Sequence, residues 1–512
     1  NQPRFELLNA DLASRIEVVR GPQSALWGSE AIGGVIAVDG SKTAPLSGSA
    51  EAGSFGFRRA SASGSAKGLA LGVGWQQATG IDSFDGHGDR DGYRNLSGRA
   101  SGRWQVSPSV ELGGSGFALT GRSEFDGYVG FNRGDTLDSS RNRLLAGRLW
   151  SSFGRVGARW HGTLATTLLG SSNRNFLGDD EINRTRGRRW TLSGQGEHRF
   201  TTGPVSHTLI AAAEHEQESF GAHDTIYFGA TNQDRDRNHQ ALTLEWRGEA
   251  GRLVGDVALR NDRFNRFADA TTLRASALAK LGKGFALAAS YGEGIAQPTF
   301  FDLYGFFPGS FVGNPGLKPE SSSGGELSLR FRGDRVQASL TAYRQRLREE
   351  IVDVFDFATF TSTTVNRDGK SRRQGVEAEV GWNPSGALRL TAYHAYLDAS
   401  EPGAVGDLQV KELRRPKHSG SIAADGEVGR WAYGAALTYT GRHGDVRDSF
   451  PYDRVALGAY WLAGARFAYR VSKAVELFAR AANALDANYQ DVFGYRTEGR
   501  SIYAGLRIAA GR

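Results

Sequence analysis

Acidic side chains gather in two stretches whose composition marks them as loops. The first, IDSFDGHGDRDGY, spans residues 81–93, and the second begins near residue 121. Their carboxylates stand at Asp82, Asp85, Asp89, Asp91, Asp126 and Asp138. Calcium takes six to eight oxygen ligands, and carboxylates from two neighbouring loops could supply most of them. Asp and Gly also favour turns for local reasons, so a calcium site and simply solvated loops both remain open from these residues alone.

Aromatic side chains crowd two further loops. They are Phe300, Phe301, Tyr304, Phe306, Phe307 and Phe311 in one loop, and Tyr489, Phe493 and Tyr495 in the last. Surfaces of this kind hold large, flat ligands with few polar anchors. Aromatic rings also form girdles at the headgroup level of a membrane, so both roles remain open here.

Catalysis is not expected from these residues. The chain has no Cys, its 10 His are scattered, and no glycine-rich phosphate loop follows a strand and opens a helix. The net charge of +7 raises the question of nucleic acid, but Lys and Arg are scattered among Asp and Glu along the chain. The sequence therefore predicts a protein that is neither an enzyme nor a nucleic-acid binder.

Strands with two unlike faces must position these loops. From Leu46 onward apolar and polar residues alternate; along residues 431–439, for example, the large apolar side chains share one face. Alternation of this kind, in hairpins with short turns at one end and long loops at the other, predicts an all-β fold, a transmembrane antiparallel β-barrel of about 22 strands. No run of about 18 apolar residues could form a membrane-spanning helix. A soluble propeller would need a repeat of about 40–45 residues, which the sequence lacks.

The first 45 residues differ from the rest. Residues 15–20 predict a short strand, Ser24 to Trp27 a helical turn that Gly28 ends, and Val35 to Val38 a second strand. Such a segment is too small to bury its own core. A barrel of about 22 strands has a lumen that can hold it.

The motifs in these regions are specific enough to indicate a family. RIEVVRGPQSALWGSEAIGGVIAV (residues 15–38) resembles the plug of TonB-dependent receptors, and three later stretches resemble the barrel signatures of that family. These are QPTFFDLYGFFPGSFVGNPGLKPESS (297–322), NRDGKSRRQGVEAEV (366–380) and NALDANYQDVFGYRTEGRSIYAGLRI (483–508). The resemblance implies that residues 1–45 are the C-terminal part of a plug domain and that residues 46–512 form the barrel. Within the family, LYGFF, GNPGLKPE and GYRTEGR most resemble the vitamin B12 (cobalamin) transporter.

The resemblance also assigns roles to particular residues. In cobalamin transporters the corresponding acidic loops order around calcium, which implies metal ligands at Asp82, Asp89, Asp91, Asp126 and Asp138. Ligand contacts are implied for residues at the external mouth and on the buried part of the plug, namely Tyr304, Phe306, Asn314, Tyr489, Tyr495, Ser24, Leu26 and Trp27. Charged contacts between plug and barrel wall are expected from Arg15, Glu17, Arg20 and Glu30.

The implied function is active uptake of a large, scarce ligand across the bacterial outer membrane. The resemblance predicts cobalamin as the ligand, with a ferric catecholate siderophore as the alternative. A passive porin and a phage or colicin receptor are the alternatives from other classes. Expected partners are a TonB-type energising protein of the inner membrane, outer-membrane lipid and lipopolysaccharide. The segment that binds TonB in the family is absent from this chain. No signal peptide opens the chain and Asn1 is not an initiator Met, so we expect a processed or cut N-terminus. We expect the protein to be a monomer.

Overall fold

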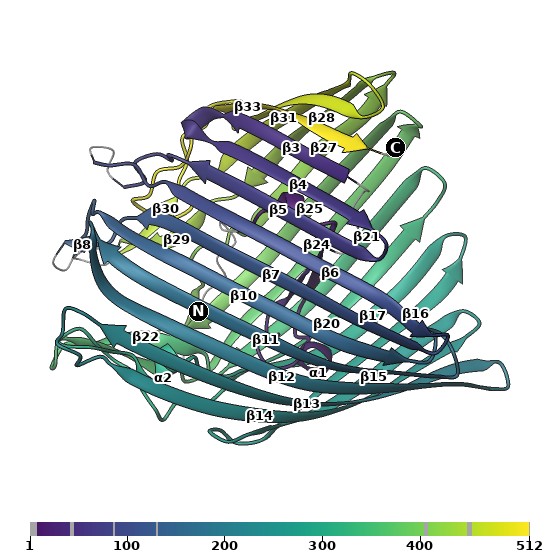
Figure 1. Cartoon of the computed structure of the whole chain (residues 1–512), viewed down its shortest axis with the longest axis horizontal. Coiled ribbons are helices and arrows are strands. Elements are labelled where there is room, and N and C mark those ends of the chain that lie inside the picture. Colours follow the sequence, from purple (N-terminus) through teal and green to yellow (C-terminus); the bar gives the residue numbers. More distant parts are fainter. Residues whose placement is uncertain are drawn as a thin grey trace.

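The computed structural model describes residues 8–40, 46–84, 88–129, 132–403, 408–447 and 453–510. Its main body is a closed antiparallel barrel of 22 strands, in which each strand pairs with the next along the chain and the first pairs with the last (Figure 1). The predicted all-β barrel and its strand number are therefore confirmed.

The barrel strands follow one another in chain order. They are β3 (Leu46–Gly53), β4 (Arg58–Ala66), β5 (Leu69–Ala78), β6 (Tyr93–Ser107), β7 (Val110–Phe125), β10 (Asp138–Phe153), β11 (Trp160–Leu177), β12 (Asp180–Thr202), β13 (Val205–Asp224), β14 (Gln233–Ala250), β15 (Leu253–Phe264), β16 (Ala270–Gly282), β17 (Phe285–Ala296), β20 (Glu320–Arg332), β21 (Val336–Arg348), β24 (Lys370–Ser385), β25 (Leu388–Pro402), β27 (His418–Val428), β28 (Trp431–Thr440), β31 (Tyr460–Arg470), β32 (Val475–Ala482) and β33 (Ser501–Ala510). The short strand β26 (Gln409–Lys411) pairs with β25 beyond β27.

The two ends of the barrel differ, as the sequence predicts. At one end tight turns join the strands, and Gly203 and Gly251 each take a φ of +56°, which such hairpin turns require and glycine tolerates. The opposite end carries long loops with small elements of their own. These are β8 (Tyr128–Val129), β9 (Asn132–Arg133), α2 (Phe300–Tyr304), β18 (Phe306–Phe307), β19 (Phe311–Val312), β22 (Ile351–Asp356), β23 (Thr361–Asn366), β29 (His443–Val446) and β30 (Arg454–Leu457). In outer-membrane barrels the short turns face the periplasm and the long loops face outward.

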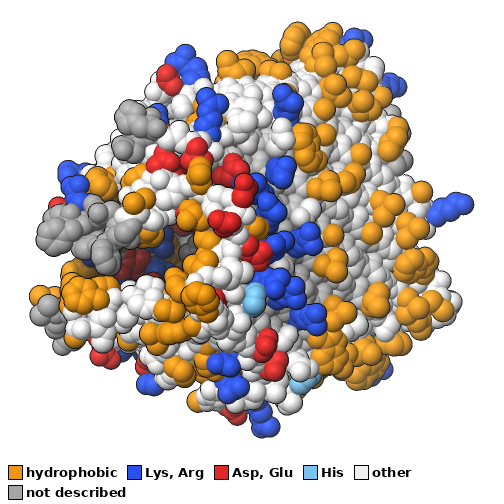
Figure 2. All heavy atoms as spheres, turned by 60° about the vertical axis from the view of Figure 1, so that its left-hand side comes forward, with side chains coloured by type: hydrophobic (Ala, Val, Ile, Leu, Met, Phe, Trp, Pro, Cys, Tyr) orange, Lys and Arg blue, Asp and Glu red, His pale blue; other side chains and the backbone are white. Residues whose placement is uncertain are grey.

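The outer face of the wall is apolar over a broad zone. Leu71, Leu145, Leu149 and Leu168 are each more than 60% exposed, although they lie on long, regular strands. Figure 2 shows hydrophobic side chains spread over this zone, away from the loop end. An apolar outside is what lipid chains require of a spanning barrel. Among the described residues, no helix is long and apolar enough to cross a membrane.

The N-terminal segment lies inside the barrel (Figure 1). After a 3-10 turn at Ala10–Leu12, β1 (Arg15–Arg20) pairs with β2 (Gly34–Asp39), and α1 (Ser24–Trp27) lies between them. This is the predicted strand, helical turn and strand. Gly34 has a φ of +146°, and a Cβ there would lie 2.4 Å from the carbonyl oxygen of Val19, so the hairpin needs glycine at this position.

Candidate functional site

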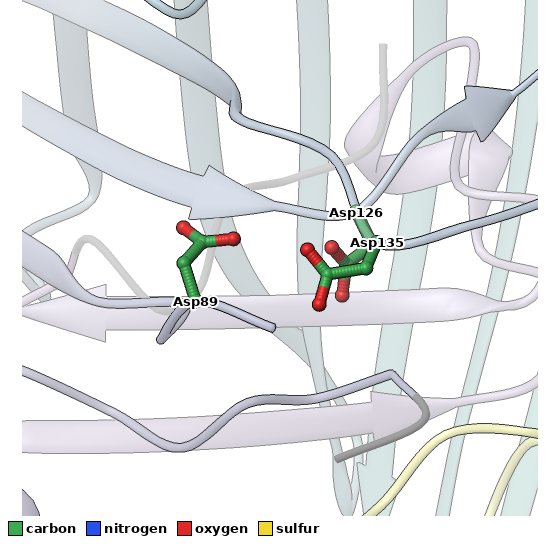
Figure 3. Close-up of side chains that lie close together, drawn as sticks. All are labelled: Asp89, Asp126 and Asp135. Carbon is green, nitrogen blue, oxygen red and sulfur yellow. The ribbon is translucent and has the colours of Figure 1, made fainter. Parts of the chain in front are cut away.

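Three carboxylates converge at the loop end of the barrel. Asp89 lies in the loop between β5 and β6, Asp126 directly follows β7, and Asp135 lies between β9 and β10. One carboxylate oxygen of each lies within 4.8 Å of the others. Figure 3 shows Asp126 and Asp135 beside each other, with Asp89 facing them from a separate segment of chain. Hairpin pairing of β6, β7 and β10 brings these loops to one place.

The electrostatics of this group show a surplus of negative charge. Burial raises the pKa of Asp126 to about 6, and the nearby charge of Asp91 contributes. Burial, together with a hydrogen bond and charge from Asp135, also raises the pKa of Asp89. Oδ1 of Asp91 is buried without a hydrogen-bond partner. Converging carboxylates with an unused buried oxygen fit a hard cation such as calcium, which takes oxygen ligands.

The residues that the sequence singled out for calcium are distributed around this group. Asp89 and Asp126 belong to it, and Ser83 Oγ donates to both Asp91 and Asp126. Asp82 instead accepts from the N–H groups of Phe84 (3.2 Å) and Gly88 (2.8 Å).

Asp138, which the sequence singled out, lies next to the acidic group, and Asp135, which it did not, belongs to the group. Asp138 accepts from Thr136 Oγ1 (2.7 Å), and the N–H of Thr136 donates to Asp126 (3.0 Å). Asp135 was missed, although it stands in the same loop and follows the turn residue Gly134. Asp85 lies outside the described residues.

Aromatic rings at the mouth are paired with arginines. Arg235 of β14 lies over the ring of Tyr304 at 4.8 Å, and the carbonyl of Tyr304 accepts from Gln233 (2.7 Å). Since Arg237, two residues further on, contacts the plug, Arg235 shares the lumen-facing side of β14. Tyr304 ends α2, which begins with a reciprocal cap between Thr299 and Asp302.

The rest of this aromatic loop is braced by its own contacts. Phe306 is 38% exposed on the hairpin of β18 and β19, and Phe301 stacks on Phe311 at 4.7 Å. The side-chain amide of Asn314 donates to the carbonyl of Thr364 (3.0 Å), and its oxygen accepts from the N–H of Gly316. In this structure Asn314 therefore ties two loops together.

The last loop supplies two more predicted ligand contacts. Tyr489 packs on Tyr460, with ring centroids 4.4 Å apart. Tyr495 accepts a hydrogen bond from Arg133, whose guanidinium lies 5.4 Å from its ring, and it packs edge-on against Phe84.

A third arginine of this region, Arg447, lies over the ring of Phe493, with its guanidinium carbon 5.1 Å from the ring centroid. Arginines stacked on rings offer both positive charge and a flat surface.

The plug residues bind the wall mainly through backbone groups. Ser24 is fully buried and accepts from the N–H of Ile295 on β17 (3.0 Å), and the carbonyl of Ile295 accepts from the N–H of Glu30 (2.7 Å). Leu26 is half-buried, and Trp27 is 53% exposed inside the barrel.

Charged plug residues divide into two groups. Arg20 pairs with Glu377 on β24, and the carboxylate of Glu30 lies 3.9 Å from Arg237 and 4.0 Å from Arg189. Arg15 and Glu17, in contrast, pair with each other within β1, so for these two the expected contact with the wall is replaced by one inside the hairpin. Strand alternation places both on the same face, close enough to pair.

Three further plug residues contact the wall, and no pattern in the sequence singled them out. Asp11 lies 3.4 Å from Arg59, and Gln23 accepts from Arg274 (3.2 Å). The carbonyl of Ile32 accepts from Ser322 (2.8 Å) and Gln345 (3.1 Å).

Known structures share this fold at low sequence identity. The siderophore receptor PirA from Acinetobacter baumannii is 17% identical with a TM-score of 0.81, over 99% of this chain and 86% of that one. A mutant of the ferric enterobactin receptor PfeA from Pseudomonas aeruginosa is 17% identical with a TM-score of 0.79, over 99% and 86%. The copper transporter OprC is 15% identical with a TM-score of 0.75, over 98% and 89%.

Family models identify both parts of the molecule. The model described as "TonB-dependent Receptor Plug Domain" matches residues 1–35, and the model described as "TonB dependent receptor-like, beta-barrel" matches residues 55–484. The second match covers most of the chain. The protein therefore belongs to the TonB-dependent receptor family, the transport barrels of the bacterial outer membrane.

Proposed function

We propose that this TonB-dependent transporter takes up an anionic, aromatic metal chelate, with ferric catecholate siderophores as the ligand class. The observation that carries the proposal is the set of arginines stacked on rings at the mouth: Arg235 on Tyr304, Arg447 on Phe493 and Arg133 on Tyr495. Flat rings and fixed positive charge match the rings and negative charge of such a chelate. Two of the similar structures described above are siderophore receptors, which supports the same class.

Cobalamin is the second candidate, and the acidic cluster favours it. In the transporters that the sequence motifs resemble most, loops of this kind order around calcium before the vitamin binds. We propose that Asp89, Asp126 and Asp135 hold a calcium ion, with Asp91 close enough to add an oxygen through its unpartnered Oδ1. The ion would hold the first two long loops together at the mouth.

Transport requires the plug to leave its contacts with the wall. The contacts to be broken include those of Ser24 and Glu30 with Ile295, of Ile32 with Ser322, and of Glu30 with the arginines of β12 and β14. The barrel supplies no energy of its own, so a pull by a TonB-type inner-membrane protein would supply the work.

One titration separates the two ligands. The full-length protein in detergent is titrated with a ferric tris-catecholate and with cyanocobalamin, each with calcium and with a chelator, and binding is followed by tryptophan fluorescence. We expect tight catecholate binding. Tight binding of cyanocobalamin alone, dependent on calcium, would overturn the siderophore proposal in favour of the second candidate.

A matched pair of variants tests the mouth itself. Arg235→Gln removes a charge from the lumen-facing side of β14, and we expect catecholate affinity to fall about tenfold, the usual effect of losing one hydrogen bond to a charged group. Arg263→Gln removes an arginine that is exposed on β15, and we expect no change. Equal effects of the two substitutions would contradict the assignment.

A further inference from the structure

Five arginines face one another across adjacent strands on the outside of the barrel. Strand register places Arg94 of β6 opposite Arg122 of β7, which lies opposite Arg141 of β10, followed by Arg174 of β11 and Arg184 of β12. We call this row the arginine ladder. Like charges directly opposite one another on neighbouring strands are destabilising, so the row has a cost that calls for a compensating ligand.

The ladder stands on the membrane-facing side of the wall. Leu145 follows Arg141 and Arg143 at two-residue steps along β10, so all three point to the same side, and Leu145 is 66% exposed to the outside. The arginines are near the loop ends of their strands. Figure 2 shows a band of positive side chains between the hydrophobic zone and the loops. This is the level at which the outer leaflet places its headgroups.

The protein neutralises little of this charge itself. Arg122 lies 3.3 Å from Glu124, and Arg174 pairs with Glu181. Across the described ranges, no ion pair joins a carboxylate to Arg94, Arg141, Arg143, Arg184, Arg186 or Arg188. Nε of Arg122 is buried without a hydrogen-bond partner.

A concave site follows directly from this arrangement. A depression of about 440 Å³ is lined by the whole ladder, together with Arg143 and Arg186 one step closer to the apolar zone. Guanidinium groups present paired N–H donors that match the oxygens of a phosphate. Seven of them around one hollow are suited to a ligand with more than one phosphate group.

An apolar groove continues from the same site. A second depression, of about 600 Å³, is also lined by Arg143 and Arg186, but its floor includes Gly98, Ala118 and Gly170. Gly98 of β6 lies opposite Ala118 of β7, and Leu145 of β10 lies between Ala118 and Gly170 of β11. The small side chains leave a hollow in the outer wall that larger side chains would fill. A groove of this kind, open to the membrane, fits a hydrocarbon chain.

We propose that the arginine ladder and the apolar groove bind a phosphorylated glycolipid of the outer leaflet, the lipid A part of lipopolysaccharide. The phosphates would lie on the ladder and an acyl chain in the groove. The inference rests on the outward face of β6 to β12 and is independent of the transported ligand.

The experiment uses the full-length protein, delipidated in a neutral detergent, with bisphosphorylated lipid A as the probe and native mass spectrometry as the readout. The variant Arg143→Gln/Arg186→Gln removes the two arginines shared by both depressions. The control Arg344→Gln/Arg346→Gln removes two exposed arginines of β21, almost opposite in the barrel order. Unheated gel migration shows whether each variant is folded; single substitutions at Arg143 and Arg186 serve if the double variant is not.

We expect lipid A affinity to fall tenfold or more in the ladder variant and less than threefold in the control, since each basic residue near a charged lipid surface contributes about 1 kcal/mol. Dephosphorylated lipid A should bind the wild type weakly, and phosphatidylglycerol should bind it less tightly than lipid A. Unchanged affinity in the ladder variant would overturn the proposal. So would equal binding of dephosphorylated lipid A, or equal binding of phosphatidylglycerol, which would indicate a general anionic-lipid surface.

Discussion

Arginines on the two faces of β12 differ in whether a carboxylate pairs with them. Arg189 points into the lumen, where its Nε donates to Glu218 (2.7 Å) and Glu216 lies 3.6 Å away. Arg186 and Arg188, within three residues of it, are exposed on the outer face with no carboxylate partner among the described residues. Alternation along one strand therefore separates paired arginines from unpaired ones.

Neighbouring strands extend the paired face. Arg237 of β14, 7% exposed, donates to the same Glu218, and Arg260 of β15 pairs with the fully buried Asp262 at 2.9 Å. Arg237 and Arg260 are almost fully buried on the lumen side, and an arginine that is buried in this way must find its counter-charge within the protein. On the outer face, water can solvate an arginine and anionic lipid headgroups can supply the counter-charge, so the protein does not need to provide a carboxylate.

The acidic loops resemble the outer face, because charges of one sign stand together there as well, but the charges are negative. Asp89, Asp126 and Asp135 stand together, and among the described residues no ion pair joins an arginine to any of the three; burial and the neighbouring carboxylates raise the pKa values of Asp89 and Asp126. A cluster of charges of one sign indicates that an ion from outside the protein binds there. The lumen ion pairs of Arg189, Arg237 and Arg260 need no such ion, because the protein supplies both charges.

The largest effect on stability is expected from breaking the lumen ion pairs. Glu218→Gln removes the carboxylate that bridges Arg189 and Arg237, and we expect the free energy of unfolding to fall by about 3–5 kcal/mol because the buried Arg237 loses its nearest counter-charge and Arg189 keeps only the more distant Glu216. Denaturant unfolding of the barrel in lipid vesicles measures it. Glu181→Gln, which removes the partner of Arg174 on the exposed ladder, should cost far less, because solvent screens an exposed ion pair. Similar losses in both variants would break the distinction between the two faces.

The acidic cluster predicts a loss of metal binding. Asp126→Asn keeps the size of the side chain but removes a charge from the buried member of the group, and we expect calcium affinity to fall more than tenfold because affinity depends on the charge of the ligand set. Isothermal titration with calcium measures it. Asp179→Asn, an exposed loop position outside the group, should leave the affinity unchanged. Calcium binding that survives Asp126→Asn would place the ion elsewhere.

The raised pKa of Asp126 predicts the pH dependence of the same loops. Its folded pKa of about 6 lies above the usual carboxyl value of about 4, so without metal the folded loop is favoured below pH 4 and loses this stability as the pH rises through 6. Calcium should reverse the trend, since the ion needs ionised ligands. Hydrogen exchange of the segments 88–92 and 134–138, corrected for intrinsic rates, should show less protection at pH 7.5 than at pH 5 with a chelator, and more with calcium. The same trend under both conditions would contradict the metal site.

Local patterns in the sequence predicted the barrel and the plug segment. The two-residue alternation settled which side chains face outward, and the stretch from Arg15 to Val38 predicted the strand, helical turn and strand that the structure contains. These features depend on neighbours along the chain, which a sequence displays directly.

Features that depend on register across strands were not predicted. Consecutive ladder arginines are separated by 10 to 33 positions in the chain, so the sequence shows them only as scattered charges. The hydrogen bonding between strands places them side by side. Asp135 joined the acidic group for the same reason. Pairing of Arg15 with Glu17 within β1 was a local effect that the expectation of a wall contact overlooked.

The ladder predicts the smallest and most diagnostic effect, because its sign depends on the surroundings. Arg141→Gln removes the central member, which faces both Arg122 and Arg174. In a neutral detergent we expect the free energy of unfolding to rise by less than about 1 kcal/mol, since the relief of two like-charge contacts exceeds the loss of the single contact between Arg141 and the ring of Phe176 (4.4 Å). With lipid A added, the same substitution should lower it, because a bound ligand stabilises the folded state in proportion to its affinity. Unfolding of both proteins with and without lipid A measures the change of sign. A substitution that destabilises the barrel equally in both conditions would show that Arg141 is a structural residue, and the contrast between the two faces would then lose its explanation on the outer side.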